Sequence, residues 1–78
     1  MKHQSAEARR AFMKEMQICN ILSSMQDGHE TEAVDYAIAN GMTPEQLGII
    51  SQYDGMLKGT SEEMAKLCRQ IRKEIENQ

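Results

Sequence analysis

The chain has 78 residues, enough for one domain but too few for a sizeable core of its own. Its net charge of −3 argues against a general nucleic-acid binder, because such proteins usually carry a basic surface. The N-terminus lacks the apolar stretch of a signal peptide and no apolar run is long enough to span a bilayer, so we expect a cytoplasmic protein without a membrane segment.

Capping signals and apolar spacing predict an all-α protein, a compact bundle of four short helices joined by tight capped turns. No stretch alternates apolar and polar residues in the manner of a strand. The expected helices cover about 5–26, 28–40, 44–58 and 61–77. They form a single domain over residues 1–78, in which we expect residues 1–4 and 77–78 to be frayed.

The first predicted helix starts after Ser5, whose hydroxyl suits an N-cap. Its main apolar face consists of Ala8, Ala11, Phe12, Cys19 and Leu22, flanked by Met16, Ile18 and Met25. Met13 and Ile21 fall outside that face, so the apolar surface is too broad for a helix that packs on one side only. The helix is therefore either central or meets a second surface. Glu15 falls within the apolar face, where we expect an edge residue that reaches water.

The second predicted helix begins where Gly28 ends the first, with Asp27 and Glu30 as a capping box. Its core-facing residues are expected to be Ala33, Val34, Ala37 and Ile38. This spacing of three and four residues is typical of one buried helix face.

A sharp corner connects the second and third predicted helices. Gly41 after Asn40 suits a left-handed helix end. Thr43 and Gln46 then form a capping box, and Pro44 fits the first helical position between them. These residues predict that the two helices meet at a tight turn.

The third predicted helix has a short apolar face. Its buried residues are expected to be Ile49, Ile50, Tyr53 and Leu57, with Leu47 near the corner. Gly48 and Gly55 each disfavour a helix by about 1 kcal/mol relative to alanine, which allows an early end near Asp54.

The fourth predicted helix follows Gly59, with Thr60 and Glu63 as a further capping box. Its apolar residues form a narrow seam of Met64, Leu67, Cys68, Ile71 and Ile75. Cys19 and Cys68 lie in apolar stripes without the spacing of metal ligands, so we expect core cysteines. A disulfide between them is expected only if the chain is exported.

Charge is segregated along the chain. Residues 1–26 carry a net charge of +2, residues 27–63 carry −7, and residues 64–78 carry +2. In one interpretation, the acidic middle lies against the basic terminal helices or is merely a solvated face. In the other, it presents an acidic surface to a basic partner. The acidic candidates for that contact are Glu30, Glu32, Asp35 and Glu45.

Basic residues form stripes on the outer faces of the first and fourth predicted helices. These residues are Arg10, Lys14, Lys66, Arg69 and Lys73. They are interpreted as solvated faces or, alternatively, as a contact site for phosphate or an acidic protein.

The corner also has a second interpretation. The spacing of Ala37, Gly41, Met42, Leu47 and Ile50 is that of a helix-turn-helix. Residues 33–52 therefore resemble the helix-turn-helix family, which implies a DNA-binding transcription regulator. The helix that would enter the major groove contains no Arg or Lys, although such a helix needs phosphate-neutralising and base-contacting donors. Nucleic acid is therefore not the expected partner, and DNA binding through residues 33–52 is kept as an alternative.

Catalytic and cofactor-binding patterns are missing from the sequence. It has two scattered histidines, no glycine-rich phosphate loop and no serine elbow. We therefore expect no enzyme activity, no cofactor and no metal site.

Methionine is unusually frequent, with 7 in the chain. Met13 and Met56 are expected near polar faces, and together with Ile21 they are the best candidates for an apolar partner-binding patch. Because a small core with few aromatic residues often gains stability by association, we also expect a homodimer.

These observations predict a small non-enzymatic helical protein that binds another protein and modulates its activity, as a regulator or inhibitor of bacterial or phage type. One alternative is a helix-turn-helix regulator that uses residues 33–52. The other is a structural assembly subunit.

Overall fold

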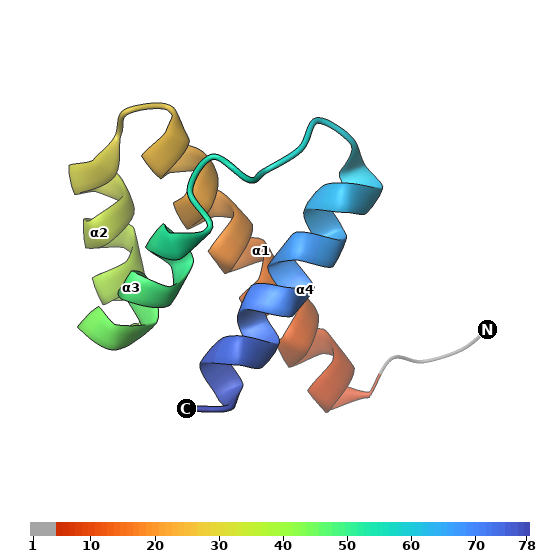
Figure 1. The fold of residues 1–78 in the computed structure, drawn as a ribbon. Coiled ribbons are helices and arrows are strands. Elements are labelled where there is room, and N and C mark those ends of the chain that lie inside the picture. The colour runs from red at the N-terminus through yellow and green to blue at the C-terminus, as the bar shows by residue number, and fades with distance from the viewer. Residues whose placement is uncertain (1–4) are drawn as a thin grey trace.

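The computed structural model describes residues 5–78, so the expectation that residues 1–4 are frayed lies outside the described part. The described chain contains four helices and no strand. They are α1 (Ala6–Gln26), α2 (Glu30–Ala39), α3 (Pro44–Gln52) and α4 (Ser61–Glu76), as Figure 1 shows. The predicted all-α bundle is therefore confirmed. Within residues 5–78, no helix has the length and apolarity needed to cross a bilayer.

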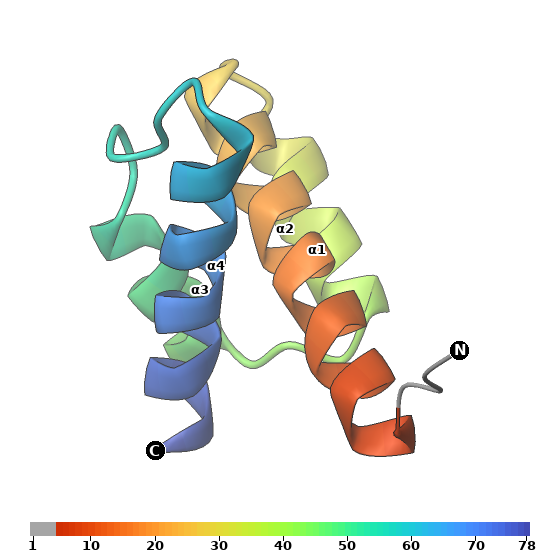
Figure 2. The ribbon, with the colours of Figure 1, turned by 90° about the vertical axis from the view of Figure 1, so that its right-hand side faces the viewer.

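The helices form two layers. In Figure 2, α1 and α4 lie in front and run in opposite directions, while α2 and α3 lie behind them. Helix α1 contacts each of the other three helices. It is therefore the central element, which explains why its apolar surface is broader than one interface requires.

Local capping sets most of the helix ends. The Ser5 hydroxyl accepts a hydrogen bond from the Ala8 amide at the start of α1, and Thr43 and Gln46 form the predicted reciprocal capping box at the start of α3. Gly41 has φ +83°, a conformation that glycine adopts without a steric penalty. The Met42 amide donates back to the Ala37 carbonyl, which closes α2 and makes the sharp corner.

Two predicted boundaries are wrong. Helix α2 starts at Glu30 with His29 as its N-cap, because Asp27 instead caps the end of α1 and does not form the predicted box with Glu30. Helix α3 ends at Gln52 and does not reach residue 58, because the chain turns at Gly55 with φ +85°. A backbone that enters this left-handed region leaves the helical path.

The core lies where α1 meets the other helices. Its buried apolar residues are Ile18, Ile21, Leu22, Ala33, Ala37, Met42, Ile49, Ile50, Ile71 and Ile75. The predicted seam of α4 is confirmed at Cys68, Ile71 and Ile75, which are all buried.

Several predicted burial states are wrong. Ile21 is fully buried, whereas Phe12 and Met16, expected in the core, are 56% and 47% exposed. In α2, only the alanines of the expected face are buried, and Val34 and Ile38 are 36% and 61% exposed. The small alanine side chains let α2 lie close to α1, which leaves the larger residues at the edge of the contact.

A tyrosine joins the end of α3 to α4. The Tyr53 hydroxyl donates a hydrogen bond to the Glu74 carboxylate and accepts one from the Gln70 amide at 3.4 Å. The hydrogen bond to Glu74 raises the pKa of the Tyr53 phenol above 10.0, and desolvation and the charge of Glu74 act in the same direction. This contact anchors the chain where α3 ends early.

The Tyr53 contact predicts a specific pH dependence. Because the folded-state pKa is raised, the contact contributes its full stability below about pH 10 and loses it as the pH rises through the folded-state pKa. In a Tyr36→Phe variant, the ultraviolet absorbance of phenolate reports Tyr53 alone, and its titration midpoint is expected above 10.0. Adding Glu74→Gln is expected to lower that midpoint. A midpoint that Glu74→Gln leaves unchanged would contradict the contact.

Candidate protein-binding groove

An open groove of about 520 Å³ runs between α1 and α4. We call it the α1–α4 groove. Its lining residues are Phe12, Glu15, Met16, Cys19 and Asn20 from α1, with Ser61, Met64, Ala65 and Cys68 from α4. Most of this lining is apolar, and the two helices that supply it lie in front in Figure 2.

Two large exposed side chains form the α1 wall of the groove. Phe12 and Met16 are four residues apart, so they lie one turn apart on the same side of the helix. Met13 is 56% exposed and extends the apolar surface beyond the groove. A cluster of exposed large apolar side chains on one helix is typical of an association surface.

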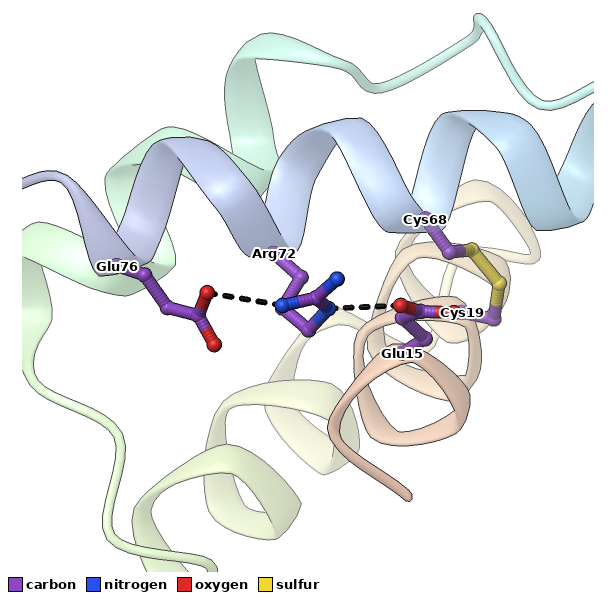
Figure 3. Close-up of polar contacts among 5 residues, drawn as sticks. All are labelled: Glu15, Cys19, Cys68, Arg72 and Glu76. Atoms are coloured by element: carbon purple, nitrogen blue, oxygen red, sulfur yellow. Dashed lines mark hydrogen bonds and ion pairs between the residues drawn. A yellow bond between two sulfur atoms is a disulfide. The ribbon is translucent and has the colours of Figure 1, made fainter. Parts of the chain in front are cut away.

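Cys19 and Cys68, which both line the groove, form a disulfide that joins α1 to α4 (Figure 3). The two Cα atoms are 5.9 Å apart, within the range that a disulfide requires. The expectation of unpaired core cysteines is therefore wrong in this structure. The bond holds α1 and α4 at one separation and so fixes the width of the groove.

An ion-pair network lies at one end of the groove. Arg72 donates from Nε to Glu15 Oε2 at 2.7 Å and from Nη1 to Glu76 Oε1 at 2.8 Å, as Figure 3 shows. The Arg72 and Glu15 side chains are only 14% and 16% exposed. The hydrogen bond to Glu15 raises the pKa of the Arg72 guanidinium above its ordinary value. Glu15 therefore has a structural partner, which accounts for a carboxylate on an apolar face.

Cations lie beside the groove on both helices. Arg9 lies one turn before Met13 on α1, and Arg69 follows Cys68 on α4. Both residues are exposed, and neither has an ion-pair partner among the described residues. At the Ser61 end, Glu62 follows Ser61. The surroundings of the groove are therefore basic near Phe12 and Cys68 and acidic at the Ser61 end.

The predicted apolar patch does not form as one surface. Ile21 lies in the core, so its assignment as an exposed contact is wrong. Met56 is 51% exposed but lies in the connection between α3 and α4, outside the lining of the groove. Only Met13 lies beside the α1–α4 groove.

The charged candidates occupy different layers. Glu30, Glu32 and Asp35 are exposed on α2, and Glu45 is exposed in the first turn of α3. The predicted basic residues Lys66, Arg69 and Lys73 line one shallow surface of α4, and Arg10 and Lys14 line another beside Arg72.

No ion pair among residues 5–78 joins the acidic middle of the chain to the basic terminal helices. The pairs in this range are those of Arg72 with Glu15 and Glu76, and that of His29 with Glu32. The predicted contact between the acidic middle and the basic helices is therefore not made through ion pairs in this part of the chain.

The corner between α2 and α3 uses its polar groups locally. The Gln46 side chain accepts a hydrogen bond from the Thr43 amide, so it is engaged in the capping box. Helix α3 carries no cation. These observations give a DNA-binding interpretation little support.

The chain was compared with protein-family models, with curated proteins and with solved structures. None of the three comparisons finds a match.

Phe12, Met16 and Met64 are the groove residues that the sequence analysis placed in the core. Their spacing suits a core as well as it suits an exposed face, so helical periodicity cannot separate the two. The polar residues Asn20 and Ser61 also line the groove, and a fully buried stripe would not contain them. They are the sequence feature that could have indicated an exposed face.

Proposed function

We propose that the chain is a non-enzymatic interaction module that binds an acidic amphipathic helix of a partner protein in the α1–α4 groove. The observation that carries the proposal is the open apolar groove, which has exposed Phe12 and Met16 on one wall and, beside it, cations without an ion-pair partner among residues 5–78. Binding there would let the chain regulate or inhibit its partner, as the sequence analysis predicts.

The shape of the groove supports a helical ligand. From Phe12 to Asn20, the α1 wall extends about 12 Å at a rise of about 1.5 Å per residue, which matches two turns of a bound helix. Helices that bind in grooves bury apolar residues three and four positions apart. Methionines such as Met16 and Met64 adapt their side chains to such anchors.

The charges support an acidic ligand. Arg9 and Arg69 flank the apolar surface without acidic partners in the described chain, so a carboxylate beside the bound apolar residues would be attracted to them. A basic helix would be repelled by the same two arginines.

The predicted cytoplasmic location disagrees with the disulfide that lines the groove. Cytoplasmic reductants keep thiols reduced, whereas oxidising compartments preserve disulfides. The bond between Cys19 and Cys68 therefore favours an oxidising compartment over the cytoplasm. Binding experiments should compare the oxidised and reduced protein.

Pull-down from cell extract tests the proposal. Met16→Glu places a carboxylate in the groove and is expected to reduce the recovery of a specific partner at least tenfold, an effect of about 1.4 kcal/mol. The matched control is Met56→Glu, which makes the same change at an exposed methionine in the connection between α3 and α4. Recovered proteins are quantified by mass spectrometry, with circular dichroism confirming that both variants are folded. Equal recovery by Met16→Glu and the wild type would place the interface elsewhere.

A further inference from the structure

Helix α2 carries an exposed apolar edge that the fold does not use. Val34 and Ile38 lie one turn apart and are 36% and 61% exposed, while the neighbouring Ala33 and Ala37 pack into the core. Glu30 lies one turn before Val34. We call the exposed side of Glu30, Val34, Asp35 and Ile38 the α2 ridge.

We propose that the α2 ridge of one copy binds in the α1–α4 groove of the next copy, so that the chain associates head to tail. This inference rests on the proposed function, because it names the acidic amphipathic helix that the groove accepts. Head-to-tail association differs from the homodimer predicted from the sequence. It corresponds to the alternative prediction of a structural assembly subunit.

The dimensions of the two surfaces match. Helix α2 has 10 residues and is about 15 Å long, whereas the α1 wall of the groove extends about 12 Å. Val34 and Ile38 supply two anchors one turn apart, the same separation as that of Phe12 and Met16 on the groove wall.

Charge favours the contact. The ridge carries Glu30 at the first residue of α2 and Asp35 near its middle, and α2 contains no cation. The favourable arrangement places these carboxylates beside Arg9 and Arg69, which have no ion-pair partner among residues 5–78.

The two surfaces lie on different layers of the molecule. The groove belongs to the layer of α1 and α4, and the ridge belongs to the layer of α2 and α3 (Figure 2). A contact between two different surfaces leaves one of each free, so it forms open chains of molecules unless a ring closes.

The contact is small, so association is expected at high protein concentration. Interfaces at the low end of the size range bind weakly, with dissociation constants of roughly micromolar to millimolar. Because exposed charges contribute to it, association should weaken as salt is added.

Sedimentation equilibrium of the purified, oxidised chain tests the proposal. The average mass of the wild type is expected to rise with concentration beyond twice the monomer mass. Met16→Glu blocks the groove and Ile38→Glu blocks the ridge, so each variant alone is expected to remain monomeric. A mixture of the two retains one working groove and one working ridge, and is expected to reach twice the monomer mass and stop there.

Each other outcome overturns the proposal. A wild type that remains monomeric at all concentrations, or a mixture that does not dimerise, excludes head-to-tail binding. Dimers that persist in Ile38→Glu and disappear in Met16→Glu indicate direct pairing of two grooves. In either case, a partner protein that the wild type recovers from extract and Met16→Glu does not would leave the proposed function intact.

Discussion

Reduction of the disulfide between Cys19 and Cys68 is expected to lower the free energy of unfolding by about 4 kcal/mol. The two cysteines are 49 residues apart, so the bond closes a loop that contains all of α2 and α3. Closing a long loop reduces the conformational entropy of the unfolded chain, and the folded state is stabilised by comparison. The total free energy of unfolding of a domain of this size is commonly only about 5 kcal/mol or somewhat more. Reduction is therefore expected to remove most of the stability.

Urea unfolding followed by circular dichroism measures this effect. The oxidised protein, the reduced protein and the Cys19→Ala/Cys68→Ala variant are compared under the same conditions. The alanine variant is the control, because dithiothreitol should leave its unfolding midpoint unchanged while it lowers the midpoint of the wild type. A difference below about 1 kcal/mol between the oxidised and reduced wild type would show that the bond does not provide the expected constraint.

Ile21→Ala is expected to destabilise the oxidised protein by about 3 kcal/mol, within the usual range of about 2–5 kcal/mol for such changes. Ile21 is fully buried in the contact of α1 with its neighbours, so the substitution removes methyl groups and leaves a cavity. Met13→Ala is the matched control on the same helix. Met13 is 56% exposed, and its substitution is expected to change stability by less than about 0.5 kcal/mol.

The same urea experiment distinguishes the two variants. A large difference between them supports the packing of α1 with Ile21 inside and Met13 outside. Equal effects would mean that α1 is rotated about its axis relative to the structure described above. That result would also remove Met13 from the surface beside the α1–α4 groove.

Local chemistry made most of the fold predictable from the sequence. Ser5, Thr43 and Gly41 act on backbone groups within a few residues, so their effects can be read without knowledge of the tertiary structure. The early end of α3 depends on the balance between the low helix propensity of its glycines and the packing of Tyr53 on α4. Only the first of these factors is visible in the sequence.

Burial was predicted less well because it depends on where neighbouring helices lie. Helix α4 has a narrow apolar seam, so only one orientation buries it, and that orientation was predicted correctly. Helix α1 is apolar over a wide arc, and contacts with three helices select Ile21 for the core while leaving Phe12 and Met16 outside. The α1 wall of the candidate groove consists of residues that are apolar but not buried, so the groove could not be derived from helical periodicity alone.

The covalent loop has a further consequence for the integrity of the molecule. The irregular connection between α3 and α4 lies between Cys19 and Cys68 in the chain, within the loop that the disulfide closes. A protease that cuts there produces two fragments that stay linked through sulfur, each still carrying one wall of the α1–α4 groove. Proteolysis alone therefore cannot separate the two walls, and the fragments come apart only after reduction.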